Sequence, residues 1–228
     1  MNIAIVVAAG SGKRFGAEKP KQFLEICGKP LLIHTLQKFS DCPAIDEIIL
    51  VLAAEEIENF QPILAKYNFN KSIKLISGGQ TRAASVFNGL KSIDSLKAKI
   101  VAVHDGARPL VTIEEITRTI ETAKVSGAAC LTAAVTDTIK EISGGKIVRT
   151  IDRSKLRRAL TPQAFRFEII KRAFENVDLS EAATDECFLV EKLGIEISAV
   201  EGSAENIKIT TPEDLIFAEN ILRKTQKI

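Results

Sequence analysis

A cluster of glycines and basic residues near the N-terminus carries the clearest chemistry in this sequence. The segment Ala8–Arg14 reads Ala-Ala-Gly-Ser-Gly-Lys-Arg, it follows a continuous apolar run, and Lys21 comes soon after it. Backbone N–H groups in a glycine-rich turn form a concave anion site, and lysine and arginine add full positive charge. We therefore expect this loop to bind phosphate groups.

The same loop does not match two common nucleotide-binding motifs. A Walker A loop requires Gly-x-x-x-x-Gly-Lys-Ser/Thr, whereas Phe15 lies five residues after Gly10. The dinucleotide fingerprint Gly-x-Gly-x-x-Gly also fails, because Phe15 takes the place of its third glycine. The sequence thus favours a phosphate ligand but argues against a dinucleotide oxidoreductase.

A second group of reactive side chains follows the apolar run at 100–104. Asp105 and Arg108 lie three residues apart, directly after His104. A carboxylate at a strand end beside a phosphate loop suits Mg²⁺, which usually takes one or two carboxylates together with substrate phosphates. The residue types are equally compatible with a turn cap at Asp105 and a surface ion pair at Arg108. We expect His104 to be a structural residue of the sheet.

Two further segments place polar groups where an anionic ligand could bind. Gly79, Arg82 and Ser85 lie at the expected start of a helix, and helix N-termini favour anions. An ordinary turn capped by Thr81 would give the same residues. Lys208 lies within an apolar segment, so its ammonium group requires an anionic partner.

These residues are expected to be positioned by alternating strands and helices. The apolar, β-branched segments expected to form strands are Ile3–Ala8, Glu47–Leu52, Ile73–Ile76, Ile100–His104, Ala128–Ala134, Ile195–Val200 and Ile207–Thr210. The segments expected to form helices are Pro30–Phe39, Glu55–Tyr67, Thr81–Ser92, Ile113–Ser126, Phe167–Val177, Asp185–Leu193 and Pro212–Arg223. This alternation predicts a single α/β domain over residues 1–228, with a Rossmann-like, doubly wound, mostly parallel sheet. Ligands in such sheets bind at the carboxyl ends of the strands, where the loops described above fall.

The segment Thr138–Thr150 departs from this alternation. It consists of two short alternating strands joined by Gly144 and Gly145, which predicts a β-hairpin. An isolated hairpin is only marginally stable in water and needs a surface to pack on. The residues alone leave open whether this arm, at about residues 136–157, packs on its own domain or on a second subunit.

Composition excludes several classes of function. The net charge is +2, and the chain has one tyrosine and no tryptophan, so we expect no nucleic acid partner. No apolar stretch is long enough to span a membrane, and the N-terminus lacks the basic start of a signal peptide. The cysteines are far apart and suggest free thiols in a reducing cytoplasm rather than disulfides; they are Cys27, Cys42, Cys130 and Cys187.

Taken together, the polar segments resemble the 2-C-methyl-D-erythritol 4-phosphate cytidylyltransferases of the non-mevalonate isoprenoid pathway. The resemblance extends from Ile3 to about Leu222, and it depends on the order and spacing of the motifs more than on any one of them. The motifs are Ala8–Arg14, Pro20–Leu24, Gly78–Ser85, Val103–Pro109, Asp137–Lys140, Asp152–Arg153, Leu160–Gln163, Thr184–Glu186 and Asn206–Asp214.

The resemblance implies a reaction, a metal and a set of roles. CTP and methylerythritol 4-phosphate would give the CDP-alcohol and pyrophosphate with Mg²⁺, and Asp105 would serve the metal. Arg14 and Lys21 would be the catalytic cations that hold the triphosphate. The nucleotide-binding residues would be Ala8, Ala9, Gly10, Gly12, Gly79, Arg82 and Ser85. The residues binding the sugar-alcohol phosphate would be Arg108, Thr138, Arg153, Thr161, Thr184 and Lys208.

The resemblance also implies a homodimer, in which the hairpin arm carries Thr138 and Arg153 into the neighbour's site. The nearest alternative is a ribitol 5-phosphate cytidylyltransferase, which shares the nucleotide loops and acts on a different alcohol phosphate. The pair Ala8-Ala9 before Gly10, and Asp152-Arg153 followed by Leu160–Gln163, favour methylerythritol phosphate over ribitol phosphate.

Overall fold

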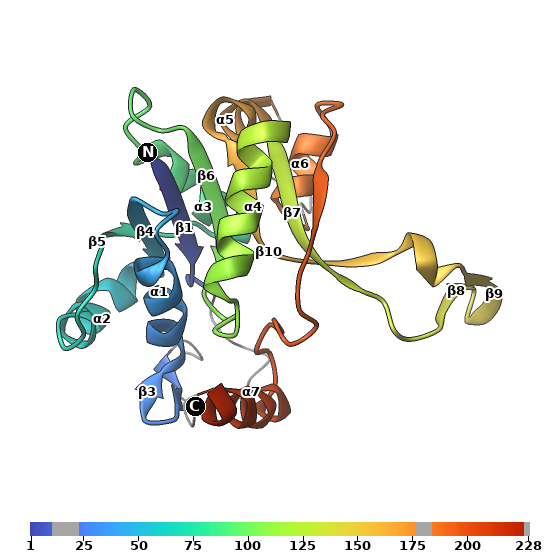
Figure 1. Ribbon diagram of the computed structural model, residues 1–228, viewed down its shortest axis with the longest axis horizontal. Helices are drawn as coiled ribbons and strands as arrows, with labels where there is room; N and C mark the ends of the chain where they lie inside the picture. The colour runs from blue at the N-terminus through green and yellow to red at the C-terminus, as the bar shows by residue number, and fades with distance from the viewer. Residues whose placement is uncertain (11–22, 177–183, 226–228) are drawn as a thin grey trace.

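The protein is an α/β domain built on one mixed sheet, shown in Figure 1. The structure is a computed structural model that describes residues 1–10, 23–176 and 184–225. The seven strands of the sheet lie in the order β11-β7-β10-β6-β1-β4-β5. They are β1 (Asn2–Val7), β4 (Glu47–Leu52), β5 (Ser72–Ser77), β6 (Ile100–Asp105), β7 (Ala128–Ala134), β10 (Arg157–Arg166) and β11 (Ser198–Glu201). The expected fold class is confirmed.

The central strand β1 shows why an unbroken apolar run forms this sheet. Ala4 and Val6 pack with the helices of one face, and Ile3 and Ile5 pack with those of the other. Successive side chains of a strand point to opposite faces, so a strand covered on both sides must be apolar throughout. Parallel pairing with β4 on one side and β6 on the other then aligns the carboxyl ends of these three strands.

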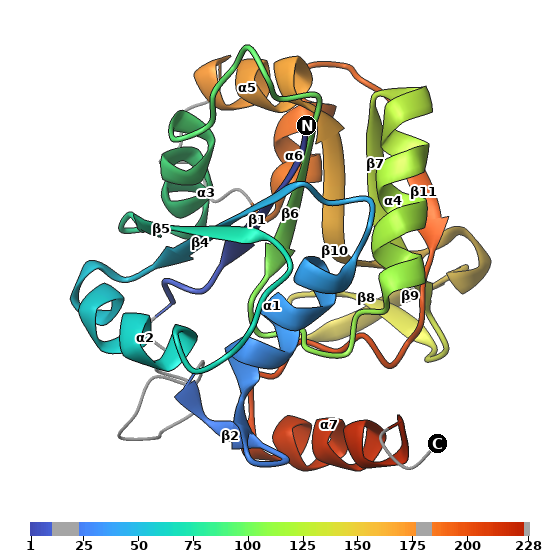
Figure 2. The same ribbon diagram turned by 60° about the vertical axis from the view of Figure 1, so that its left-hand side comes forward.

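Helices cover both faces of the sheet. On one side α1 (Leu31–Asp41) and α4 (Ile113–Ser126) contribute to the core, and on the other side α3 (Arg82–Lys91), α5 (Phe167–Asn176) and α6 (Glu186–Glu191) do so. The described residues also form α2 (Ile57–Leu64), α7 (Pro212–Thr225) and the 3₁₀ turns Ala54–Glu56 and Arg153–Lys155. Figure 2 shows α7 apart from the sheet, beside the small hairpin of β2 (Glu25–Ile26) and β3 (Lys29–Pro30). No helix in the described ranges is long and apolar enough to cross a membrane.

One predicted strand is absent from the structure, and one observed strand is not predicted by the sequence. The predicted strand Ile207–Thr210 is wrong: this segment runs beside the loop after β6 and is joined to it by a hydrogen bond from Ile209 N to Ala107 O of 2.8 Å. Strand β10 was not predicted, because its sequence is polar and contains Pro162. It lies antiparallel between β6 and β7, and its pairing with β7 is interrupted between Ala159 and Gln163.

The hairpin arm extends away from the body of the molecule (Figure 1). It consists of β8 (Ile139–Ser143) and β9 (Lys146–Ile151), joined by Gly144 and Gly145 with φ angles of 55° and 75°. Positive φ at both residues gives the turn twist that a two-residue hairpin needs. Its apolar side chains are exposed, including Ile142 at 65%, Ile147 at 66% and Val148 at 58%. These side chains of the arm therefore do not pack on the part of the domain that the structure describes.

Candidate active site

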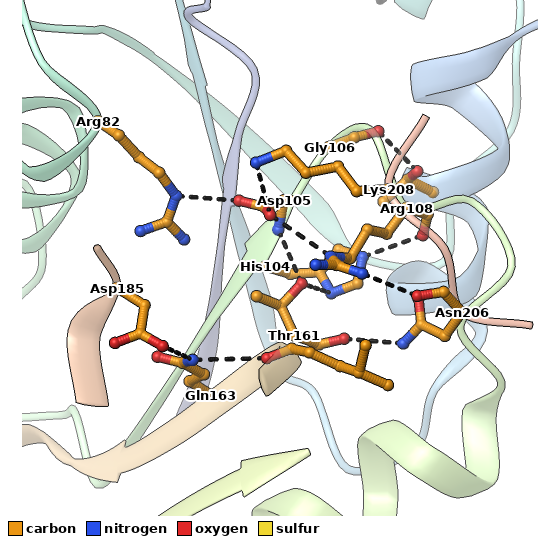
Figure 3. Close-up of polar contacts among 12 residues, drawn as sticks. Arg82, His104, Asp105, Gly106, Arg108, Thr161, Gln163, Asp185, Asn206 and Lys208 are labelled. Carbon is orange, nitrogen blue, oxygen red and sulfur yellow. Dashed lines mark hydrogen bonds and ion pairs between the residues drawn. The ribbon is translucent and has the colours of Figure 1, made fainter. Parts of the chain in front are cut away.

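Asp105, at the end of β6, is the centre of a cluster of cations (Figure 3). Its Oδ1 accepts a hydrogen bond from Arg82 Nε at 3.0 Å. Its Oδ2 lies 3.0 Å from Lys208 Nζ and 3.4 Å from Arg108 Nε. The cations come from the start of α3, the loop after β6 and the segment after β11, so the fold brings distant parts of the chain to one carboxylate.

The carboxylate of Asp105 is ionised at neutral pH. Burial raises its pKa, but the opposing charges of Arg82, Lys208 and Arg108 outweigh burial and hold the pKa well below the usual range. The three cations outnumber the two buried carboxylates of the cluster, Asp105 and Glu186, so positive charge predominates at this edge of the sheet. Such a site favours an anionic ligand.

Glu186 is a member of this cluster that sequence reasoning missed. Arg82 donates from Nη1 to Oε1 of Glu186 at 2.6 Å and from Nη2 to Oε2 at 3.0 Å. Glu186 is 1% exposed, and burial raises its pKa while Arg82 opposes that increase. The sequence offers only an acid after Thr184-Asp185, with no sign that its partner lies at the start of α3.

His104 and Thr161 form a buried support directly beneath the cluster. His104 Nε2 lies 3.1 Å from the carbonyl oxygen of Arg108, and Nδ1 lies 3.0 Å from Thr161 Oγ1. Because a carbonyl can only accept, we assign the proton to Nε2, so the Thr161 hydroxyl donates to Nδ1. Burial lowers the pKa of His104 to about 3. The imidazole is therefore neutral and structural, as the sequence predicts.

The Thr161 hydroxyl makes two protein hydrogen bonds. Besides donating to His104, it accepts a bond of 3.1 Å from the backbone N–H of Asp105. Thr161 thus lies at the site, as its predicted substrate-binding role requires, but its proton is already shared with the histidine. The predicted role stays a prediction.

Two buried amides, Asn206 and Gln163, were not among the predicted site residues. The side-chain Nδ2 of Asn206 donates to the backbone carbonyl oxygen of Thr161 at 2.9 Å. The backbone carbonyl oxygen of Asn206 accepts a hydrogen bond from Arg108 Nη1 at 2.8 Å. Gln163 Nε2 donates to Asp185 Oδ2 at 2.8 Å. These bonds join the segment after β11 and the start of α6 to β10. Both amides lie in motifs that carry the family resemblance, Leu160–Gln163 and Asn206–Asp214, but the resemblance assigns them no role.

The described start of the first predicted nucleotide loop, Ala8–Gly10, lies beside the loop after β5. A Cβ added at Gly78 would lie 2.4 Å from Ala9 Cβ, so the loop after β5 approaches the loop after β1 closely enough to require glycine. Gly79 N donates to Ser85 Oγ at 3.1 Å, which fixes the paired glycines to the start of α3. Ala8 is held by a hydrogen bond from its N to Val51 O of 2.8 Å. Gly10 ends this described segment.

Other predicted residues are not brought to Asp105. Thr138 and Arg153 lie on the exposed arm, where the Arg153 guanidinium donates to the carbonyl oxygen of Thr136. Thr184 is exposed and lies just before α6. Three predicted residues lie outside the described residues: Gly12, Arg14 and Lys21.

The fit of the predicted Mg²⁺ depends on Asp105. Within residues 1–10, 23–176 and 184–225, no group of three His, Cys, Asp or Glu side chains is arranged to hold a metal ion. Both oxygens of Asp105 already contact cations. The described residues therefore do not fit a resident metal, and the role of Asp105 as a metal ligand stays a prediction.

A mostly parallel sheet whose carboxyl edge carries a cationic cluster beside the Ala9 and Gly79 segments suits an enzyme that binds phosphates, such as a nucleotidyltransferase. The sequence profile of 2-C-methyl-D-erythritol 4-phosphate cytidylyltransferase, IspD, matches residues 2–224. The enzyme of that name from Bacillus velezensis is 46% identical over 223 residues, covering 97% of this chain and 95% of the relative. That from Clostridium acetobutylicum is 46% identical, covering 98% of each. The chain belongs to the IspD family.

Solved structures agree with this assignment. The 4-diphosphocytidyl-2C-methyl-D-erythritol synthase from Anaerococcus prevotii superposes with a TM-score of 0.86 at 33% identity, covering 98% of this chain and 96% of that one. The Francisella tularensis 2-C-methyl-D-erythritol 4-phosphate cytidylyltransferase gives a TM-score of 0.79 at 36% identity, covering 95% and 97%. Fold and sequence therefore lead to the same family over the full length.

Proposed function

We propose that this chain transfers CMP from CTP to 2-C-methyl-D-erythritol 4-phosphate, giving 4-diphosphocytidyl-2-C-methyl-D-erythritol and pyrophosphate. An oxygen of the substrate phosphate attacks the α-phosphorus of CTP. A new P–O bond forms, the bond from the α-phosphorus to the bridging oxygen breaks, and pyrophosphate leaves with that oxygen. The observation that carries the proposal is the cationic cluster around Asp105, beside the Ala9 and Gly79 loops of an IspD-family chain.

The chemistry does not require a general base. The attacking phosphate is already an anion at neutral pH, so the barrier lies in bringing two anions together and stabilising charge at phosphorus. Arg108 and Lys208 are suited to bind the substrate phosphate, because each carries a guanidinium or ammonium group at the cluster. Neutral, buried His104 takes no part in proton transfer.

The nucleotide half of the site is proposed from the adjoining loops. Ala8 to Gly10, with Gly79 and Ser85, would surround the cytosine and ribose, and Arg14 and Lys21 would hold the triphosphate. We further propose that Mg²⁺ is held chiefly by the triphosphate, because the described residues offer no unoccupied set of carboxylates.

The exposed arm supports a homodimer. Ile142, Ile147 and Val148 present exposed apolar surface that the described residues of the domain do not cover. A neighbouring subunit would cover this surface, and Thr138 and Arg153 would then lie in the neighbour's site. A cytoplasmic location belongs to the same proposal, and the four free cysteines suit a reducing compartment.

A paired turnover assay tests the proposed substrate. The purified chain is incubated with CTP, Mg²⁺ and either methylerythritol 4-phosphate or ribitol 5-phosphate, and pyrophosphate release is measured. We expect kcat/KM to be higher with methylerythritol phosphate. Preference for ribitol phosphate would contradict the proposal, and omission of each alcohol phosphate provides the blank for CTP hydrolysis.

A further inference from the structure

The ion pair between Arg82 and Glu186 joins the two halves of the site. Arg82 is the first residue of α3, beside the nucleotide loop, and Glu186 is the first residue of α6, beside Thr184. Two parallel N–H···O bonds link the two side chains, at 2.6 and 3.0 Å. Bidentate geometry of this kind fixes the orientation of the guanidinium as well as its position.

The orientation of Arg82 determines how Asp105 is held. With both Nη atoms bound to Glu186, the Nε–H of Arg82 is directed at Asp105 Oδ1, at 3.0 Å. Oδ1 is thereby occupied, and Oδ2 is the oxygen that contacts Arg108 and Lys208 (Figure 3). A guanidinium held by two protein carboxylates is poorly placed to serve as a direct ligand of a triphosphate.

We infer that Glu186 is a positioning residue that acts through Arg82 to orient the Asp105 carboxylate, and with it the cations that bind the substrate phosphate. Glu186 is 1% exposed, and a buried carboxylate is expensive unless it is paired. An apolar pair could fill the same volume at equal or better stability. The inference rests on the proposed phosphate-binding roles of Arg108 and Lys208.

The first test is Glu186→Gln in the full chain, with Glu191→Gln as the matched control. Glu191 is exposed at the other end of α6 and makes no ion pair with the cluster. Glutamine keeps the volume of glutamate but accepts only one of the two Arg82 bonds, because its NH₂ group faces a donor. We expect kcat/KM for methylerythritol phosphate to fall about 10- to 100-fold, as small displacements of catalytic groups commonly do. The Kd of CTP should change by less than about twofold, since the nucleotide loops are untouched.

The second test is a double-mutant cycle that separates positioning from stability. Arg82→Met/Glu186→Leu replaces the ion pair with apolar side chains and should unfold at a temperature close to wild type. Its kcat/KM should remain as low as that of Arg82→Met alone, because Asp105 has lost the Nε–H in both variants. Recovery of kcat/KM together with stability would show that the pair is only structural and would overturn the inference.

The cycle also has an outcome if the double variant fails to fold. Glu186→Gln alone then decides: wild-type kcat/KM, or equal losses in CTP affinity and in kcat/KM, would overturn the inference. Failure of the proposed function is distinguishable, because wild-type protein would then give no turnover with methylerythritol phosphate.

Discussion

Lys208→Met is the substitution whose effect can be worked out most directly from the structure. The ammonium group lies 3.0 Å from Asp105 Oδ2, and the side chain is 34% exposed. Without it Asp105 still contacts Arg82 at 3.0 Å and Arg108 at 3.4 Å, so the anion keeps two partners. A partly exposed ion pair contributes little, so the free energy of unfolding should fall by about 1 kcal/mol or less.

The effect of Lys208→Met on transfer should be much larger than its effect on stability. If Lys208 binds the substrate phosphate, the variant loses one charge-assisted hydrogen bond, worth about 1.5–3 kcal/mol. At about 1.36 kcal/mol per factor of ten, kcat/KM for methylerythritol phosphate should fall about 10- to 150-fold.

The assay is steady-state pyrophosphate release at saturating CTP with varied methylerythritol phosphate, together with urea unfolding. Lys66→Met is the control, because Lys66 is exposed and lies beyond α2. A Lys208→Met enzyme with the kcat/KM of the control would refute the reasoning, since the ammonium group would then not contact the phosphate. A large loss of stability would equally refute it, because Asp105 would then depend on Lys208 alone.

Three further predictions concern the proposed cation, the buried histidine and the arm. Lys21→Ala should abolish pyrophosphate release while circular dichroism stays unchanged; unaltered release would remove Lys21 from the mechanism. His104 has a pKa lowered to about 3, so its contribution to stability is complete above pH 6.5 and is lost as the pH falls towards 3. The unfolding free energy of wild type should therefore fall by about 1.4 kcal/mol per pH unit more than that of His104→Gln between pH 6 and 4, and parallel urea-unfolding curves would contradict this. Ile147→Lys/Val148→Lys should give poorly active monomers in sedimentation, unlike the single change Leu96→Lys at an apolar residue off the arm that is 95% exposed; an intact dimer after the double change would rule out the arm as the interface.

The sequence predicts elements whose signal is local. The apolar run at Ile3 has to be covered on both faces, so its place inside a parallel sheet follows from the residues alone. The hairpin follows from Gly144 and Gly145 in the same way. The anionic partner that Lys208 requires is confirmed as Asp105, although the strand predicted around that lysine is not present.

The features that the sequence does not predict depend on contacts between residues that are far apart in the chain. Strand β10 is polar and contains Pro162, and only its position between β6 and β7 makes it a strand. Arg82 and Glu186 are separated by 104 residues, so no spacing rule could pair them. Asn206 and Gln163 are site residues because of their partners, the carbonyl oxygen of Thr161 and the carboxylate of Asp185, and those partners become adjacent only on folding.

Exchange of the arms would determine how defects in two subunits combine within one dimer. If the arms are exchanged as proposed, each active site is built from residues of two polypeptides. A subunit with a defective site but an intact arm would then complement a subunit with the reverse defect: the mixed dimer keeps one whole site, assembled from the sound half of each parent. Residues of the arm and residues around Asp105 would form two complementation groups within a single gene, and strong dilution of the protein would inactivate every site without altering the fold of any chain.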